Sequence, residues 1–185
     1  MECARTAEKD LERPQERRGP LVIDRFCLAV ATGFHLSYIP FWLTARFPDL
    51  QRKRWTGAGH VGAALGWISL YALPTGLSLG VCLILATVFA SWASGRADRV
   101  LGSHDDPRIV VDETVGFWTA AAWLPRDPWT LAGAFVLFRF FDAMKFEPYR
   151  RLERLPGGWG VVLDDVGAGI AANLLVRSVL YFRPV

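Results

Sequence analysis

The pattern of charged and apolar residues is dominated by one long uncharged stretch at residues 55–95. A helix that spans a bilayer needs about 20 apolar residues, so this stretch is long enough for two such helices. The sequence Pro-Thr-Gly at 74–76 stands near its middle, where it favours a turn. We therefore predict a transmembrane hairpin with arms at residues 59–73 and 77–94. The first arm is rich in glycine and alanine, which permits close contact with a neighbouring helix.

An earlier uncharged run, at residues 26–45, is also long enough to cross a bilayer, but Gly33 and Pro40 interrupt it. If it crossed, the basic cluster at 52–54 would lie opposite the basic N-terminal segment, which the positive-inside rule disfavours. We predict a broken or re-entrant segment that returns to the side on which it started. Residues 1–25 are charged and lack the apolar core of a signal peptide, so we expect a disordered cytoplasmic tail.

Three further helices are predicted in the second half of the chain, at residues 109–124, 128–145 and 160–182. Each carries carboxylates inside it or at its ends, and the uncharged core of each is short. Short cores are typical of helices that pack inside a bundle or dip partly into lipid. The chain shows no strand-like alternation longer than four positions and no internal repeat. The predicted fold class is all-α, a small multi-helix membrane-embedded bundle in a single domain at residues 26–185.

The composition supports a membrane-embedded protein. Hydrophobic residues make up 52% of the chain, which is rich for a soluble domain of this size. The net charge is only +3, but basic residues gather at 17–18, 52–54 and 150–154. Because no base-reading motif accompanies these clusters, they fit anionic lipid headgroups better than nucleic acid. The three cysteines share no metal-ligand spacing, which predicts reduced and buried thiols.

The chemically informative residues are carboxylates in apolar surroundings. Four of them follow His104 within nine residues, and others stand in two later segments. The acidic positions are Asp105, Asp106, Asp112, Glu113, Asp142, Asp164 and Asp165. A carboxylate is costly to bury unless a cation or a partner charge compensates it. Their recurrence without Cys or paired His ligands predicts a hard cation, and Mg²⁺ is the expected cofactor.

Arg139, Asp142 and Lys145 stand three residues apart, so on a helix they form one ridge. The plain alternative is a surface ion-pair ladder at the end of a helix. The ridge adjoins four phenylalanines, which is a poor fit to a solvated face. Next to a bound cation, Arg139 and Lys145 would form a phosphate clamp.

Each acidic pair also has a simpler explanation. Asp164 and Asp165 would point about 100° apart on a helix, and they could act as caps or dipole-favoured acids after the glycines at 157–158. Asp112 and Glu113 could likewise follow an N-cap as the acidic first turn of a helix. The combination of recurring acids with Arg and Lys nevertheless predicts metal-assisted phosphoryl transfer to water. The chain holds no G-x-S-x-G, Cys–His nucleophile pattern or Walker A loop.

Three motifs together resemble the phosphatidylglycerophosphatase A family in order and spacing. They are D-D-P-R-I-V-V-D-E-T-V-G at 105–116, F-R-F-F-D-A-M-K-F-E-P at 138–148 and G-G-W-G-V-V-L-D-D-V-G-A-G at 157–169. Upstream, W-T-G-A-G-H at 55–60 stands where the family has a P-G-T-x-G-S run. The resemblance implies a Mg²⁺-dependent lipid phosphatase of the bacterial inner membrane that converts phosphatidylglycerophosphate into phosphatidylglycerol. The predicted hairpin makes the protein multi-pass, and the basic clusters at 52–54 and 150–154 predict an active site on the cytoplasmic side.

The resemblance assigns roles to individual residues. The first candidates for metal ligands or holders of metal water are Asp112, Glu113, Asp142 and Asp165, and Asp106 and Asp164 come next. Arg139 and Lys145 would bind the phosphate of the phospholipid substrate and neutralise charge in the transition state. The nucleophile would be water or, alternatively, a carboxylate that forms an aspartyl-phosphate.

Two other classes of protein are open at this stage. A non-catalytic cation-binding membrane protein, such as a transporter subunit, would also carry intramembrane carboxylates, but it predicts acids in the middle of long helices. An inactive scaffold would keep the fold, although the intact set of acids argues against it.

Overall fold

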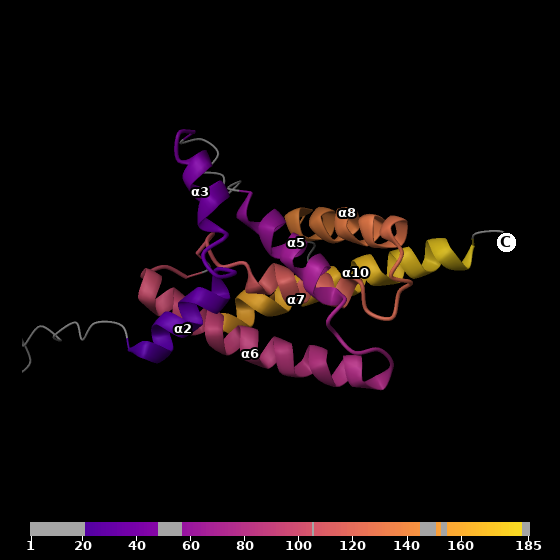
Figure 1. Cartoon of the computed structure of the whole chain (residues 1–185), viewed down its shortest axis with the longest axis horizontal. Helices are drawn as coiled ribbons and strands as arrows, with labels where there is room; N and C mark the ends of the chain where they lie inside the picture. The colour runs from indigo at the N-terminus through magenta and orange to yellow at the C-terminus, as the bar shows by residue number, and fades with distance from the viewer. Residues whose placement is uncertain (1–20, 48–56, 105, 145–150, 153–154, 183–185) are drawn as a thin grey trace, which may run out of the picture.

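The computed structural model describes residues 21–47, 57–104, 106–144, 151–152 and 155–182. Within these residues the chain forms seven helices and no strand, which confirms the all-α prediction (Figure 1). The helices are α2 (Val22–Ala31), α3 (Tyr38–Thr44), α5 (Ala58–Leu70), α6 (Leu77–Leu101), α7 (Val111–Ala120), α8 (Pro128–Met144) and α10 (Gly158–Tyr181). Helix α2 starts inside the predicted N-terminal tail, whose first 20 residues lie outside the described part of the chain.

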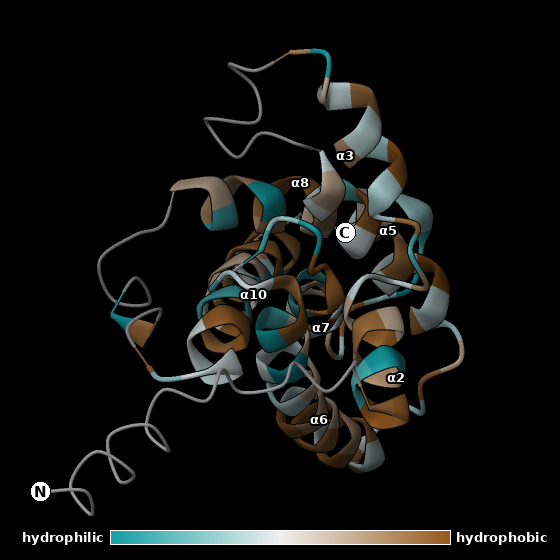
Figure 2. Cartoon of the chain, turned by 90° about the vertical axis from the view of Figure 1, so that its left-hand side faces the viewer, coloured by the Kyte–Doolittle hydropathy of each residue, from teal (hydrophilic) through white to brown (hydrophobic). Residues whose placement is uncertain are grey.

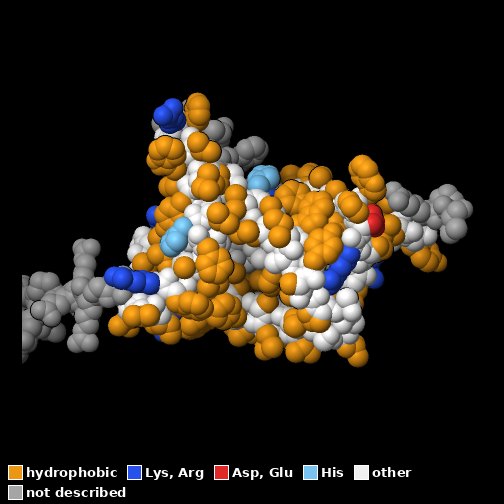
Figure 3. Space-filling model, viewed as in Figure 1, with side chains coloured by type: hydrophobic (Ala, Val, Ile, Leu, Met, Phe, Trp, Pro, Cys, Tyr) orange, Lys and Arg blue, Asp and Glu red, His pale blue; other side chains and the backbone are white. Residues whose placement is uncertain are grey.

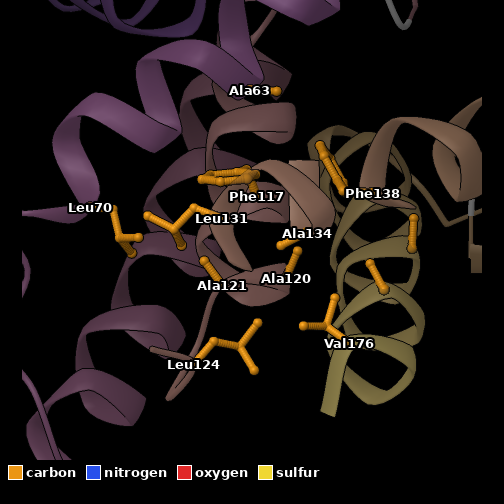
Figure 4. Packing of buried hydrophobic residues seen from close by; sticks show 12 residues of the cluster. Ala63, Leu70, Phe117, Ala120, Ala121, Leu124, Leu131, Ala134, Phe138 and Val176 are labelled. Carbon is orange, nitrogen blue, oxygen red and sulfur yellow. The ribbon is translucent and has the colours of Figure 1, made fainter. Parts of the chain in front are cut away.

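Helix α7 lies at the centre of the bundle, where it packs against α5, α6, α8 and α10. In Figure 1, α5 and α8 lie above α7 and α6 lies below it, and Figure 2 shows the same layers from one end. Phe117 of α7 and Phe138 of α8 are fully buried in the main hydrophobic core (Figure 4). Trp67 of α5 stacks on Phe117 with the ring centroids 6.0 Å apart. The core therefore joins three helices that are distant in the sequence.

Glycines let the central helices approach each other closely. A methyl group at Gly169 of α10 would overlap the carbonyl oxygen of Gly116 on α7 and lie 3.0 Å from the Cβ of Thr119. A methyl group at Gly62 of α5 would overlap the carbonyl oxygen of Val110, directly before α7. The backbones of α5 and α10 thus pack on α7 with no room for a side chain at these positions.

The predicted transmembrane hairpin is only partly right. The turn at 74–76 is present, and Gly76 precedes α6 with a φ of 69°. The predicted first arm is too short, because the 13 residues of α5 extend about 20 Å and the hydrocarbon core is about 30 Å thick. Within the described residues, α5 and α6 do not pack against each other. Each of them packs against α7 instead. The small residues of the first arm serve this contact with α7.

Two helices, α6 with 25 residues and α10 with 24, are long and apolar enough to cross a membrane. The uncharged core of α10 is nevertheless short, as predicted, because Asp164, Asp165 and Arg177 lie inside the helix. Most of the apolar part of α6 is not buried by the protein, and Leu77 and Ile84 are 92% and 66% exposed. Hydrophobic side chains cover much of the surface seen in Figure 3. An apolar surface of this extent is typical of contact with lipid.

The segment at 26–45 is broken, as predicted, between α2 and α3. Gly33, Phe34 and His35 have φ angles of 58°, 54° and 67°. Consecutive residues in the left-handed region end one helix and turn the chain before the next. The segment therefore does not form a single spanning helix.

The glycine contact between α7 and α10 predicts unequal effects of two identical substitutions. Gly169→Ala should lower the free energy of unfolding by about 1–3 kcal/mol, because the added methyl group overpacks the helix contact. Gly133→Ala on α8, where an added Cβ meets nothing within 4 Å, is the matched control and should leave stability unchanged or raise it. Thermal unfolding in detergent measures both. Equal melting temperatures for the two variants would contradict the close contact.

Candidate metal and phosphate site

Asp112 and Glu113 stand in the first turn of α7. The N–H of Val110 donates to the carbonyl oxygen of Ala31 over 2.8 Å, which ties the start of α7 to the end of α2. The N-cap residue of α7 is Val110, and no side chain caps the helix. Acids in a first turn are favoured by the helix dipole, but that does not explain why Asp112 is only 7% exposed. Their burial requires a further explanation.

Asp165 of α10 faces the two acids of α7. One ligand oxygen from each of Asp112, Glu113 and Asp165 can be chosen so that all three lie within 4.8 Å of one another. Asp165 is 4% exposed. The structure thus brings together three of the four acids that sequence analysis ranked first, although more than fifty positions separate Asp112 from Asp165.

The spacing of the glycines explains this convergence. Gly116 follows Asp112 by four residues, and Gly169 follows Asp165 by four residues. Residues four apart lie on the same face of a helix, so each acid stands one turn from the glycine contact. A methyl group at Gly116 would lie 3.0 Å from the carbonyl oxygen of Asp165. The glycine contact therefore fixes how closely the carboxylates approach.

The carboxylates of this cluster lack partners that their burial requires. Oδ1 of Asp112, Oε2 of Glu113 and Oδ2 of Asp165 are buried and accept no hydrogen bond from the described residues. A buried and unpaired carboxylate oxygen costs several kcal/mol, and here three of them lie together. A bound divalent cation would satisfy all three at once. Hard oxygen ligands of this kind fit Mg²⁺, which prefers oxygen donors and retains some water.

The titration of the α7 acids reflects the same burial. Burial raises the pKa of Glu113 well above its ordinary value, and the neighbouring charge of Asp112 raises it further. Burial also raises the pKa of Asp112. Both carboxylates therefore carry an electrostatic cost when ionised, which a bound cation would remove.

Helix α8 places a cation next to these acids. The Nη1 of Arg139 donates to Oδ2 of Asp142 over 2.6 Å, and both side chains are less than 20% exposed. A methyl group at Gly59 of α5 would lie 2.7 Å from Nη2 of Arg139 and would also overlap Oε1 of Glu113. Gly59 therefore marks the point where Glu113 and Arg139 meet. Arg139 and Asp142 of the predicted ridge form an ion pair, and this pair lies inside the site and not on a solvated face.

Arg139 also has an unused donor. Its Nε–H is buried and finds no acceptor among the described residues. Three acceptors without donors thus lie beside one donor without an acceptor. A cation that carries an anionic ligand would satisfy both sets, and a phosphate group has the charge and the oxygens for this role.

One predicted residue stands at the margin of this cluster, and another lies outside the described residues. Asp164 is half-buried next to Asp165, seven residues into α10, so it does not cap a helix whose N-cap is Gly157. Lys145 lies outside the described residues, and its role as a phosphate ligand stays a prediction. Asp165 lies about 10 Å from the start of α10 at a rise of about 1.5 Å per residue, so the site is recessed below that end of the bundle.

Asp106 belongs to a different set of contacts. Its Oδ1 and Oδ2 accept hydrogen bonds from Nε and Nη2 of Arg108, each over 2.7 Å, and Oδ2 also accepts one from Ser103. Burial alone would raise the pKa of Asp106, but the hydrogen bonds from Arg108 and Ser103 lower it overall. His104 pairs with Asp98 over 3.2 Å. Neither residue belongs to the group of Asp112, Glu113 and Asp165, and the role of Asp106 as a metal ligand stays a prediction.

Sequence analysis missed the contribution of α5 to the site. Gly59 was interpreted only as a small residue for helix packing, because a glycine carries no chemical group that marks a site. The next residue, His60, is exposed, and its pKa is lowered by partial burial and by the charge of Arg139. His60 therefore lies near Arg139 on the open side of the cluster. The replacement of P-G-T-x-G-S by W-T-G-A-G-H was the signal that pointed to this helix.

Comparison with known proteins agrees with the motifs. The family model for phosphatidylglycerophosphatase A matches residues 29–180. No solved structure matches the chain.

Three curated relatives are similar over most of their length. A putative phosphatidylinositol-3-phosphatase of Bacteroides thetaiotaomicron is 36% identical over 154 residues, which cover 80% of this chain and 89% of that protein. A phosphatidylglycerophosphatase A of Haemophilus influenzae is 35% identical over 129 residues, 69% of this chain and 78% of the relative. A phosphatidylglycerophosphatase A of Escherichia coli is 31% identical over 149 residues, which cover 80% of this chain and 69% of that protein.

The contacts of Asp106 predict a pH-dependent stability. Because the native pKa of Asp106 lies below its ordinary value of 3.8, its ion pair stabilises the fold above that pH and stops doing so as the pH falls through the native pKa. Asp106→Asn should cost on the order of 2 kcal/mol at pH 6, the range for hydrogen bonds to a charged group. The gap in melting temperature between wild type and variant should begin to narrow below about pH 4 and close as the pH falls through the native pKa. A gap of constant size down to pH 2.5 would show that the charge of Asp106 is not responsible.

Proposed function

Because the chain belongs to the phosphatidylglycerophosphatase A family of phosphoric monoester hydrolases, we propose that it hydrolyses phosphatidylglycerophosphate to phosphatidylglycerol and phosphate with Mg²⁺ as its cofactor. The chain is a membrane protein with two candidate spanning helices, so a phospholipid is a substrate it can meet in its own environment. The class of reaction follows from membership of this family. The site geometry supports the cofactor and the roles of individual residues.

The observation that supports the proposal best is the pairing of unsatisfied groups in one place. Within the part of the chain that the structure describes, three buried carboxylate oxygens find no donor, and the buried Nε–H of Arg139 beside them finds no acceptor. In the Asp106–Arg108 pair, by contrast, Nε and Nη2 of Arg108 donate to the two carboxylate oxygens of Asp106. In a site that binds a cation and a phosphate, the carboxylate oxygens and the Arg139 donor have no partner within the protein, because the two ligands supply the partners.

The proposed metal ligands are Asp112, Glu113 and Asp165. Asp142 and Asp164 stand next to them and would hold water molecules of the ion. Bound there, Mg²⁺ would neutralise phosphate charge and make water a stronger nucleophile. We leave Asp106 out of this set because Arg108 and Ser103 already engage its oxygens.

Arg139 is the proposed phosphate ligand of the protein. Asp142 holds one end of its guanidinium through Nη1, which orients the side chain and leaves the Nε–H directed away from that ion pair. A donor fixed in this way can follow the charge that develops on the phosphoryl oxygens in the transition state without moving. The partial burial of Arg139 strengthens the interaction because water screens it less.

We propose that the site faces the cytoplasm in a bacterial inner membrane. The site lies toward the end of the bundle where α6 ends and α10 begins, and α6 carries Arg96 and Arg99 at that end. Arg25 of α2 and Arg108 belong to the same end of the fold. Basic residues at one end of the spanning helices mark the cytoplasmic side under the positive-inside rule.

Two alternatives follow from specific observations. The relative from Bacteroides is named for a phosphoinositide substrate and covers as much of the chain as any of the three, so a different phosphorylated headgroup is the second candidate. A non-catalytic cation site is the third, because Asp165 lies inside a long helix, as such a protein would require. The open donor of Arg139 beside the carboxylates favours an enzyme that binds phosphate.

Phosphate release by the purified protein tests the function directly. We expect Mg²⁺-dependent release from phosphatidylglycerophosphate, slower release from phosphatidylinositol 3-phosphate and phosphatidic acid, and none from any substrate in EDTA. Full activity in EDTA would contradict the metal site. Preferred turnover of the phosphoinositide would replace the proposed substrate while keeping the reaction class.

Two variants of one helix separate the roles of Arg139 and Asp142. Arg139→Ala should lower kcat/KM by about 10²–10³-fold, as loss of a preorganised donor does, and excess Mg²⁺ should not restore it. Asp142→Asn should weaken Mg²⁺ binding, so that excess Mg²⁺ partly restores turnover. Adding Mg²⁺ should raise the melting temperature of Arg139→Ala as it does that of the wild type. For Asp142→Asn the same rise should require a higher Mg²⁺ concentration.

If the pair were only structural, the two variants would behave alike. Both would lose similar amounts of thermal stability and keep most of their turnover across the Mg²⁺ titration. That outcome would remove both residues from the reaction.

A further inference from the structure

Helix α3 projects from the bundle and exposes apolar side chains. In Figures 1 and 2 it runs across the direction of α6 and α10 and stands clear of them. Ile39, Trp42 and Leu43 are 58%, 72% and 58% exposed, and no residue of the helix is buried. Phe47, directly after α3, is 59% exposed. In water such a surface would be unfavourable by about 25 cal/mol for each Å² of apolar area.

One side of α3 is nevertheless firmly attached. The hydroxyl of Ser37 donates to the carbonyl oxygen of Arg108 over 2.6 Å. The guanidinium of Arg108 lies over the rings of Tyr38 and Phe41, 5.7 and 5.6 Å from their centroids. Since Asp106 holds Arg108 in place, α3 is fixed to the loop that precedes α7. The exposed residues lie on the face that these contacts leave free.

The direction of α3 determines what can cover that face. If α6 and α10 cross the membrane, a helix perpendicular to them lies parallel to the bilayer plane. The exposed face then continues the apolar surface of the spanning helices into one leaflet. Trp42 has the amphipathic ring that is favoured at the membrane interface, and Arg46, exposed just after the helix, can reach anionic headgroups.

We propose that α3 is an in-plane membrane anchor that lies in the headgroup region of one leaflet and holds the first turn of α5, which borders the site, at the level of lipid phosphates. The helix is linked to the site by a short path. A methyl group at Gly57 would lie 3.6 Å from Cβ of Pro40 in α3, and two residues later Gly59 borders Glu113 and Arg139. Insertion of α3 thus sets the depth of the first turn of α5. This role in catalysis rests on the proposed function, whereas the position of α3 in lipid does not.

The depth of α3 can be measured without catalysis. In a variant without Cys3 and Cys82, a fluorophore is attached at Trp42→Cys and the protein is reconstituted into vesicles of phosphatidylglycerol and phosphatidylcholine. We expect quenching by lipids that carry a nitroxide near the headgroup and weak quenching by aqueous iodide. Strong quenching by iodide alone would overturn the proposal. A label shielded from both quenchers would also overturn it, since a second copy of the chain or another protein would then cover α3.

The effect on turnover distinguishes anchoring from a structural role. Trp42→Ser should raise KM several-fold for a long-chain phosphatidylglycerophosphate in vesicles and leave kcat/KM unchanged for a short-chain, water-soluble analogue. Trp129→Ser is the matched control, because Trp129 is 84% exposed at the start of α8, away from the site. Equal losses on both substrates would show that α3 only supports the fold. A label in lipid combined with no phosphate release by any variant would reject the proposed function and keep the anchor.

Discussion

The close contact between α7 and α10 is the constraint on which the site depends. At Gly116 and Gly169 the two backbones pack with no space for a side chain. One turn away on each helix stand Asp112 and Asp165, so the glycines set the distance between the carboxylates. Like charges at this distance repel each other strongly in a buried setting. Backbone packing therefore holds together groups that their own electrostatics would separate, which is how a fold prepares a cation site.

Two other acids of the described residues, Asp106 and Asp24, behave differently. Asp106 pairs with Arg108 and Asp24 pairs with Arg96, each over 2.7 Å. These pairs lie where α2, α3 and the α6–α7 loop meet the bundle, and each carboxylate is balanced within the protein. Among the described residues, Arg139 contributes the positive charge next to the α7–α10 cluster, and Asp142 already engages it. The excess of negative charge in one place, beside balanced pairs elsewhere, distinguishes a site from a structural network.

The chemistry of the site could be predicted from the sequence more reliably than its architecture. Asp112, Glu113 and Asp165 carry groups that are costly in apolar surroundings, so each one stands out in the chain. The first arm of the predicted hairpin is too short to span, which the sequence could not show because an uncharged stretch reports only that no charge is present, and a 13-residue helix packed on α7 gives the same pattern as a spanning one. Gly59 could not be recognised from the sequence because it contributes by having no side chain. Any side chain there would overlap Glu113 and Arg139. Packing partners are set by three-dimensional contacts that no local pattern encodes.

The central claim is that carboxylates from α7 and α10 together form one cation site. Anomalous diffraction from crystals grown with Mn²⁺ in place of Mg²⁺ tests this claim most directly. The account predicts an anomalous peak about 2.2 Å from oxygens of Asp112, Glu113 and Asp165, a typical distance for hard oxygen ligands. It also predicts that Gly169→Ala weakens that peak, because the variant separates the two helices. A peak at Asp98 and Asp106 with none between α7 and α10 would contradict the account.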